Sequence, residues 1–327
     1  MSEVRAALVL GLIAGCCACE QPYSNEDLRF MRSLPTVADV TIAVPAVEPA
    51  PESEIATFYL RARESSAALN DVIFSPIRIV EAVTQGPPSY RDADLRGWGP
   101  FSEGDAQYVL YVSRTATSAA RPLTSTTTLV PVSERFDYIL YGQGGSAVDL
   151  VPIFSGSFAP VGPGGQGIGT MFIDLETSRA VNGKGPDRGW YSGGYDTRDG
   201  RLDLVLGVAM PEDLGGAADR LSGYYRFGQS EAGTDFTLSY LQDLQAMVGL
   251  PPSSALEVVS MRARWRPDQR GRADVYIGQG DLPIDVTAVE CWDERFRRVF
   301  FFSTGDQLGP SSGSVEACAP DLRRPPD

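Results

Sequence analysis

The chain has 327 residues, 43% of them hydrophobic, and a formal net charge of −14. That length and composition are sufficient for one large domain with a substantial core. The negative charge argues against nucleic acid as a partner, because phosphate binding needs clustered positive charge. The sequence contains no histidine, which excludes Ser-His-Asp and Cys-His catalysis and every histidine-ligated metal site.

The chain begins with a short apolar run, Ala6 to Ala14, which passes into Leu12-Ile-Ala-Gly-Cys16. About ten apolar residues are half of what crosses a bilayer, so residues 1–15 are predicted to be a cleaved signal peptide. Small residues followed by a cysteine are typical of a bacterial lipoprotein signal, in which the thiol accepts a diacylglycerol. Cys16 is therefore the predicted lipidation site, and the lipid bilayer is the predicted partner of this acyl anchor.

Residues 16–52 have the composition of a lipidated tether. Ser24 to Asp27 is expected to cap a short helix that runs through Arg32, and the proline-rich stretch Val44 to Pro51 predicts an extended spacer. Cys17 follows the lipidated residue where an aspartate would favour the inner membrane. By that sorting rule the protein is expected at the outer membrane, facing the periplasm or the cell surface.

A helical hairpin is predicted over residues 53–86. The first helix, from Ser53 to about Leu69, has apolar residues at three- and four-residue spacing. The second begins with Ser75 as N-cap and Pro76 at the first helical position, and Gly86 ends it. A hairpin of this kind cannot bury both of its faces alone, so it must pack on a broad apolar surface.

That surface is expected from an antiparallel β domain over residues 95–303, where the period of the apolar residues changes to two. The clearest strand is Val259 to Arg266, with apolar residues on one face and Ser260, Arg262, Arg264 and Arg266 on the other. Short turns such as Asp199-Gly200 join the strands, so neighbours in sequence should be neighbours in space. Such a mainly β (α+β) meander is predicted to curl into a barrel or half-barrel under the helical hairpin. Further alternating segments are Tyr108 to Val112, Phe136 to Leu140, Met171 to Leu175, Leu202 to Val208 and Phe236 to Tyr240.

Five cysteines are present, and four remain if Cys16 is lipidated. In an oxidising compartment a Cys291–Cys318 disulfide is expected to hold the C-terminal tail, residues 304–327, on the domain. Cys17 and Cys19 are separated by one residue where zinc sites use two to four, and no histidine is available to complete a site. No metal is therefore expected.

Several stretches of the chain resemble a group of uncharacterised bacterial lipoproteins that have an acylated N-terminus and a β-rich body. They are Trp98-Gly-Pro100, Gly167 to Asp174, Arg264-Trp265 with Gly271 to Val275, and Glu290-Cys-Trp-Asp293. The resemblance covers about two-thirds of the chain and implies fold and location without implying a catalytic residue. The architecture is also similar to periplasmic half-barrels that carry lipids or lipoproteins.

No residue is predicted to be catalytic, and no cofactor is expected. A carboxylate pair of the glycosidase kind would have to come from acids near strand ends, namely Asp274, Asp285, Glu290 and Asp293. Gly162 to Gly167 fits a dinucleotide-binding pattern but leads into a predicted strand where that fingerprint needs a helix. Asp196 to Asp203 faintly resembles a calcium loop with the wrong spacing.

The sequence therefore predicts a membrane-anchored envelope lipoprotein, non-enzymatic, that serves as a structural or interaction module and contacts an envelope protein. The first alternative is a carrier that holds a lipid or another apolar ligand in a curved sheet, and a carboxylate-based hydrolase is the second. A filled interior under the helices favours the module, whereas a continuous apolar cavity there favours the carrier.

Overall fold

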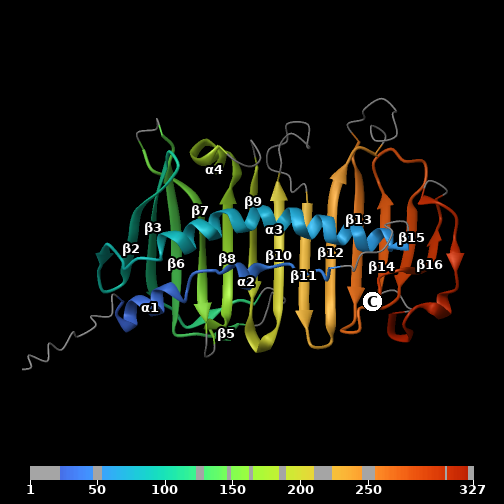
Figure 1. The fold of residues 1–327 in the computed structure, drawn as a ribbon, viewed down its shortest axis with the longest axis horizontal. Helices are drawn as coiled ribbons and strands as arrows, with labels where there is room; N and C mark the ends of the chain where they lie inside the picture. The colour runs from blue at the N-terminus through green and yellow to red at the C-terminus, as the bar shows by residue number, and fades with distance from the viewer. Residues whose placement is uncertain are drawn as a thin grey trace, which may run out of the picture.

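In the computed structural model the chain is mainly β, with one large antiparallel sheet and a long helix laid across it (Figure 1). The structure describes residues 23–46, 54–122, 129–145, 149–161, 165–183, 189–209, 223–244, 255–305 and 308–322. The predicted signal peptide, Cys16, Cys17 and Cys19 lie outside the described residues.

Within the described residues, fifteen strands form the main sheet, and every one is antiparallel to its neighbours. Their order follows the chain, so the predicted meander is confirmed. The strands are β1 (Tyr90–Arg91), β2 (Leu95–Glu103), β3 (Ala106–Ala116), β6 (Glu134–Gln143), β7 (Val151–Pro160), β8 (Gly167–Asp174), β9 (Trp190–Asp196), β10 (Leu202–Ala209), β11 (Gly223–Ser230), β12 (Gly233–Gln242), β13 (Glu257–Trp265), β14 (Gly271–Gly278), β15 (Val286–Trp292), β16 (Arg298–Ser303) and β17 (Ser312–Gly313). A separate small ribbon pairs β4 (Ala119–Ala120) with β5 (Val130–Pro131).

The two faces of the main sheet differ in chemistry because the strands alternate as their sequences predict. In β13 the residues Glu257, Val259, Met261, Ala263 and Trp265 are buried and their neighbours are half-buried. We call the face that packs on the long helix the inner face, and the opposite one the outer face. The core lies between the inner face and the helices.

The long helix is α3 (Thr57–Val83), a single continuous element where the sequence predicted a hairpin. Pro76 was expected to begin a second helix, yet it lies inside α3. Proline in a helix interior removes one hydrogen bond and costs about 3 kcal/mol. Ile73, Ile77 and Val80, on either side of Pro76, are all buried at helical spacing, and this burial outweighs the cost. The helix therefore continues through the proline.

Helices α1 (Asn25–Met31) and α2 (Val37–Val40) run beside α3 on the same face (Figure 1). The predicted cap is present, because the Ser24 side chain accepts a hydrogen bond from the Asp27 N–H and Asp27 accepts one from the Ser24 N–H. Phe30 and Val40 are fully buried. The folded domain therefore includes residues 24–40, which lie inside the stretch assigned to the tether from its composition.

Asp27 fixes α1 to the edge of the sheet. It is fully buried, and its carboxylate accepts hydrogen bonds from Arg96 Nε at 2.8 Å and Arg91 Nε at 3.1 Å. Burial alone would raise the pKa of Asp27, but the hydrogen bonds from Ser24, Arg96 and Arg91 outweigh it and lower the pKa to about 2. Asp27 is thus a buried charged anchor between α1 and the edge strands, and ion pairs of Glu26 with Arg114 and of Arg29 with Glu134 accompany it.

Aromatic rings fill the space under the N-terminal half of α3. The Tyr59 ring stacks on Phe296 with centroids 4.1 Å apart, and it contacts Trp292 at 5.5 Å and Trp265 at 6.5 Å. Farther along the sheet, the Tyr195 ring of β9 packs over Gly169 of β8. A Cβ at position 169 would collide with that ring. The inner face is therefore closely packed at these two places.

A short helix, α4 (Leu175–Asn182), follows β8 where the alternation of Met171, Ile173 and Leu175 predicted a strand. The strand ends at Asp174, whose carboxylate accepts a hydrogen bond from the Thr177 N–H. Gly183 ends α4 in the left-handed conformation. Local capping therefore stops the strand one residue before its apolar pattern ends.

Candidate functional site

The predicted disulfide is present, and it holds the C-terminal tail against the outer face. Cys291 on β15 is bonded to Cys318, and their Cα atoms are 5.5 Å apart. Both cysteines are buried. Cys318 follows the short 3-10 helix Val315–Ala317, and a second one, Pro320–Leu322, continues along the outer face. The tail therefore contributes side chains to that face.

The four acids considered for a carboxylate pair do not converge. Asp274 lies on the outer face and binds Arg272, whereas Glu290 lies on the inner face, fully buried. Asp285 accepts a hydrogen bond from the Tyr276 hydroxyl, and Asp293 lies in a turn with Arg297. Each acid has a separate structural partner.

Glu290 caps the long helix. Its carboxylate accepts hydrogen bonds from the Thr57 N–H at 2.9 Å and the Phe58 N–H at 2.6 Å, the first turn of α3. The N-cap residue Ala56 has no side-chain oxygen to do so. Burial raises the pKa of Glu290, although the two N–H donors and Arg298 act in the opposite direction.

A groove of about 700 Å³ lies on the outer face over β10 to β13. Its lining is polar and rich in arginine, in contrast to the net charge of −14 of the whole chain. The arginines are Arg201, Arg226, Arg262, Arg264 and Arg266, and the acids are Asp203, Asp235 and Asp321. The groove is thus a locally cationic surface on an acidic protein.

The register of the hairpins places these side chains in rows across the strands. One row pairs Arg226 with Thr237 and Thr237 with Arg262. The adjacent row pairs Gly228 with Asp235 and Asp235 with Arg264. Because neighbouring strands lie about 4.8 Å apart, the backbone positions of Arg226 and Arg262, on either side of Thr237, are roughly twice that distance from each other.

The turn between β11 and β12 closes one end of the groove. Gly233 has a φ of 139°, and a Cβ there would lie 2.6 Å from the Trp265 carbonyl oxygen. Only glycine allows the turn to approach β13 this closely. The hairpin is thereby held against the strand that carries Arg262 and Arg264.

Four of the five arginines have a carboxylate partner. Arg262 Nε donates to Asp235 at 2.8 Å, and Arg266 Nη1 donates to Asp321 at 3.0 Å. Arg201 and Arg264 lie 3.9 and 3.5 Å from Asp203 and Asp274. Burial lowers the pKa of Arg264, and the nearby Asp274 carboxylate acts in the opposite direction.

Arg226 differs from these four. It is exposed, and it has no hydrogen-bond or ion-pair partner within the ranges that the structure describes. Tyr224, two residues earlier on the same strand and on the same face, has 37% of its surface exposed. One guanidinium and one aromatic ring therefore project together into the groove.

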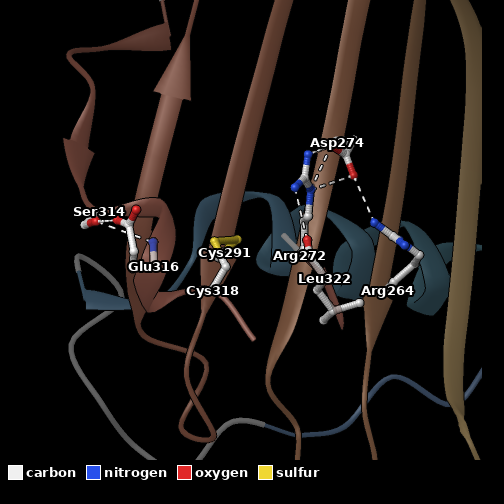
Figure 2. Close-up of a disulfide and its surroundings, with 8 residues drawn as sticks. All are labelled: Arg264, Arg272, Asp274, Cys291, Ser314, Glu316, Cys318 and Leu322. Carbon is white, nitrogen blue, oxygen red and sulfur yellow. Dashed lines mark hydrogen bonds and ion pairs between the residues drawn. A yellow bond between two sulfur atoms is a disulfide. The ribbon is translucent and has the colours of Figure 1, made fainter. Parts of the chain in front are cut away.

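The C-terminal tail forms one wall of the groove. The Leu322 carbonyl oxygen accepts a hydrogen bond from Arg272 Nη1 at 3.0 Å, and Arg272 Nε donates to Asp274 at 2.9 Å. Figure 2 shows these residues and the disulfide on the side of the strands opposite α3. Asp321 and Leu322 line the groove directly. The disulfide therefore holds this wall in place.

A second cleft, of about 1180 Å³, lies at the other end of the sheet between the C-terminal half of α3, the β2–β3 hairpin and α4. Its lining includes Asp71, Arg78, Glu103, Asp105 and Asn182. Apolar side chains, among them Ile79, Phe101 and Val181, make up a comparable part of the lining. The cleft is therefore of mixed polarity.

Among the residues with a described position, no group of three acids or cysteines is arranged to hold a metal ion. Asp196, in the stretch that resembles a calcium loop, is paired with Arg198 at 2.6 Å. None of the helices in the described ranges is both long and apolar enough to cross a bilayer. No protein-family model, curated protein or solved structure matches the chain.

Sequence reasoning identified the arginines of β13 but not the groove. The missing signal was the hairpin register, because Asp203, Arg226 and Asp235 join Arg262 and Arg264 only once β10 to β13 are aligned. The alternating apolar residues on either side of Gly233 indicate this register only approximately. The tail residues Asp321 and Leu322 carried no such signal.

Proposed function

We propose that this protein is a membrane-anchored lipoprotein of the bacterial envelope whose β domain is an interaction module. In this proposal Cys16 carries the acyl anchor, and the outer face of the sheet contacts an envelope partner. The proposal assigns the protein to the outer membrane, because Cys16 has the context of a lipidation site and is followed by Cys17 where an aspartate would favour the inner membrane. No catalytic residue forms part of it.

The observation that carries the proposal is that the two faces of the sheet differ in packing and in charge. Under the N-terminal half of α3 the inner face is filled by rings such as Tyr59, Trp265 and Trp292. The outer face leaves an open, charged groove over β10 to β13. A filled interior with an open charged exterior supports binding at the surface over transport of an apolar ligand inside.

Curvature of the sheet towards α3 also belongs to this proposal. A helix of 27 residues is about 40 Å long. It contacts β2 and β3 towards one end, and Glu290 of β15 caps the other. Eleven strand spacings separate β2 from β15, about 53 Å if the sheet were flat. The shorter helix supports a half-barrel that is concave towards α3, which small-angle X-ray scattering tests.

The anchor is tested by metabolic labelling with a palmitate analogue. Wild type and the matched control Cys19→Ala should incorporate the label, and Cys16→Ala should not. Label on Cys16→Ala would reject Cys16 as the anchor.

The interaction module is tested in cells with a photo-crosslinking residue at Tyr224 on the outer face. The control position is Arg61, which is exposed on α3. A crosslinked partner should appear from position 224 and not from position 61. Native mass spectrometry of the same protein supplies the opposing result, because co-purified lipid in a defined ratio would favour the carrier.

A further inference from the structure

We propose that the outer-face groove binds an acidic saccharide, a sugar chain that carries isolated carboxylates among many hydroxyl groups. This inference deepens the proposed interaction module and rests on it. Its basis is the set of side chains that the register of β10 to β13 brings together.

The first support is Arg226, the groove arginine with no ion-pair partner among the described residues. Arg226 presents its guanidinium to the groove, and a guanidinium binds a carboxylate through two parallel hydrogen bonds. Arg262, two strands away in the same row, donates from Nε and one terminal nitrogen to a single oxygen of Asp235. Positive charge is therefore concentrated at β11 to β13 on a chain whose net charge is −14.

The second support is the polar and aromatic setting of Arg226. Tyr224 offers a partly exposed ring on which the C–H face of a sugar can pack. Gln229, Thr234 and Thr237 also line the groove, and their amide and hydroxyl groups both donate and accept hydrogen bonds. This combination suits a ligand with a ring face, hydroxyl groups and a carboxylate.

The third support comes from the acids of the groove. Asp203 and Asp235 lie in the row next to Arg226. Their carboxylates accept hydrogen bonds from hydroxyl groups, but they repel a ligand with closely spaced negative charges. A saccharide with separated carboxylates satisfies both conditions, whereas a polyphosphate or a densely anionic lipid surface does not.

The size and shape of the groove agree with this ligand. Its volume of about 700 Å³ falls within the range of small-molecule sites. Asp321 and Leu322 of the tail form its wall, and the Cys291–Cys318 disulfide keeps that wall on the sheet. The groove is therefore built from two parts of the chain, the strands β10 to β13 and the C-terminal tail.

The test is isothermal titration calorimetry on the full-length chain in detergent, with trigalacturonic acid as the probe. Its methyl ester, which has the same rings and hydroxyl groups but no carboxylate, is the matched control ligand. Wild type should bind the acid and bind the ester at least about tenfold more weakly, because a hydrogen bond to a charged group contributes about that factor.

Two variants localise the binding. Arg226→Gln should weaken binding of the acid by about tenfold or more, and Tyr224→Ala should weaken it while Tyr224→Phe retains it. Arg226 is exposed and has no partner in the part of the chain that the structure describes, so its variant should fold normally. Arg61→Gln removes one positive charge from α3 and should bind like wild type.

Several outcomes would overturn the inference. Equal binding of acid and ester, or unchanged binding by Arg226→Gln, would show that the groove does not recognise the carboxylate. Binding to phosphatidylglycerol vesicles or inorganic phosphate in place of the saccharide would assign a different anion. If no probe binds while Tyr224 still crosslinks to a partner in cells, the ligand class is wrong and the interaction module stands.

Discussion

The inner and outer faces of the sheet are made by the same strands, yet they differ in how their polar groups are satisfied. On the inner face the few charges are buried and held by several donors, as Asp27 and Glu290 are. On the outer face, arginine and aspartate side chains of different strands form ion pairs that are partly exposed to solvent. Stability should therefore depend on the inner face and binding on the outer one. The two can be separated by mutation.

The largest expected effect is at Tyr59, on the inner side. Tyr59→Ala should lower the free energy of unfolding by about 3 to 5 kcal/mol, because it empties a packed aromatic cluster. Denaturant titration measures the change. Tyr111→Ala, at a ring 42% exposed on the outer face, is the control and should cost less than about 1 kcal/mol. Equal losses would contradict the comparison of the two faces.

The disulfide comes next, because it ties the tail to the outer face. Cys318→Ala opens a link with a sequence separation of 27, and the chain-entropy model gives a loss of about 3 to 4 kcal/mol. Denaturant titration should show the same loss for reduced wild type as for the variant. An unchanged unfolding midpoint in both would show that the tail adds no stability to the sheet.

A pH effect is expected at Asp27. The folded pKa of Asp27 is about 2, lowered from 3.8, so its contribution is fully present above pH 3.8. It is lost as pH falls towards 2, and the two values imply about 2 kcal/mol. The difference in unfolding free energy between wild type and Asp27→Asn should shrink by that amount across this interval. A difference independent of pH would contradict the low pKa.

The smallest effect is expected from an exposed ion pair of the outer face. Arg135 and Asp137 are 53% and 36% exposed, and pairs in this setting contribute about 0.5 kcal/mol or less. Arg135→Gln should therefore leave the unfolding midpoint nearly unchanged. A loss above about 1 kcal/mol would show that the charge pairs of this face are structural.

Most of the sheet could be predicted because alternation is a local signal. Val259 to Trp265 alternates as its sequence indicates, and short turns set the meander. The helices were harder to predict. Pro76 is a local stop signal, but the burial that carries α3 through it comes from the sheet. The burial of Phe30 likewise depends on distant strands, so composition alone assigned it to a tether.

The binding groove shows the same limit of local reasoning. The arginines of β13 were visible as an alternating row, but their neighbours Arg226 and Asp235 depend on pairing between strands. The disulfide was predictable from the cysteine count. Its effect of placing Asp321 and Leu322 beside those arginines was not, because it depends on the path of the tail. Capping could have located α4, since Asp174, Thr177 and Gly183 form a cap at each end.

The contact between Glu290 and the start of α3 also constrains the order of folding. Thr57 and Glu290 are separated by 233 residues. During translation, the residues of the long helix are therefore made well before the strand that caps it. Contacts of such high sequence separation form slowly, because a long loop must close first. Until β15 is in place, the start of α3 lacks both its cap and the rings of Trp292 and Phe296 that pack on Tyr59. The chain is therefore expected to need protection from aggregation until the last strands are available.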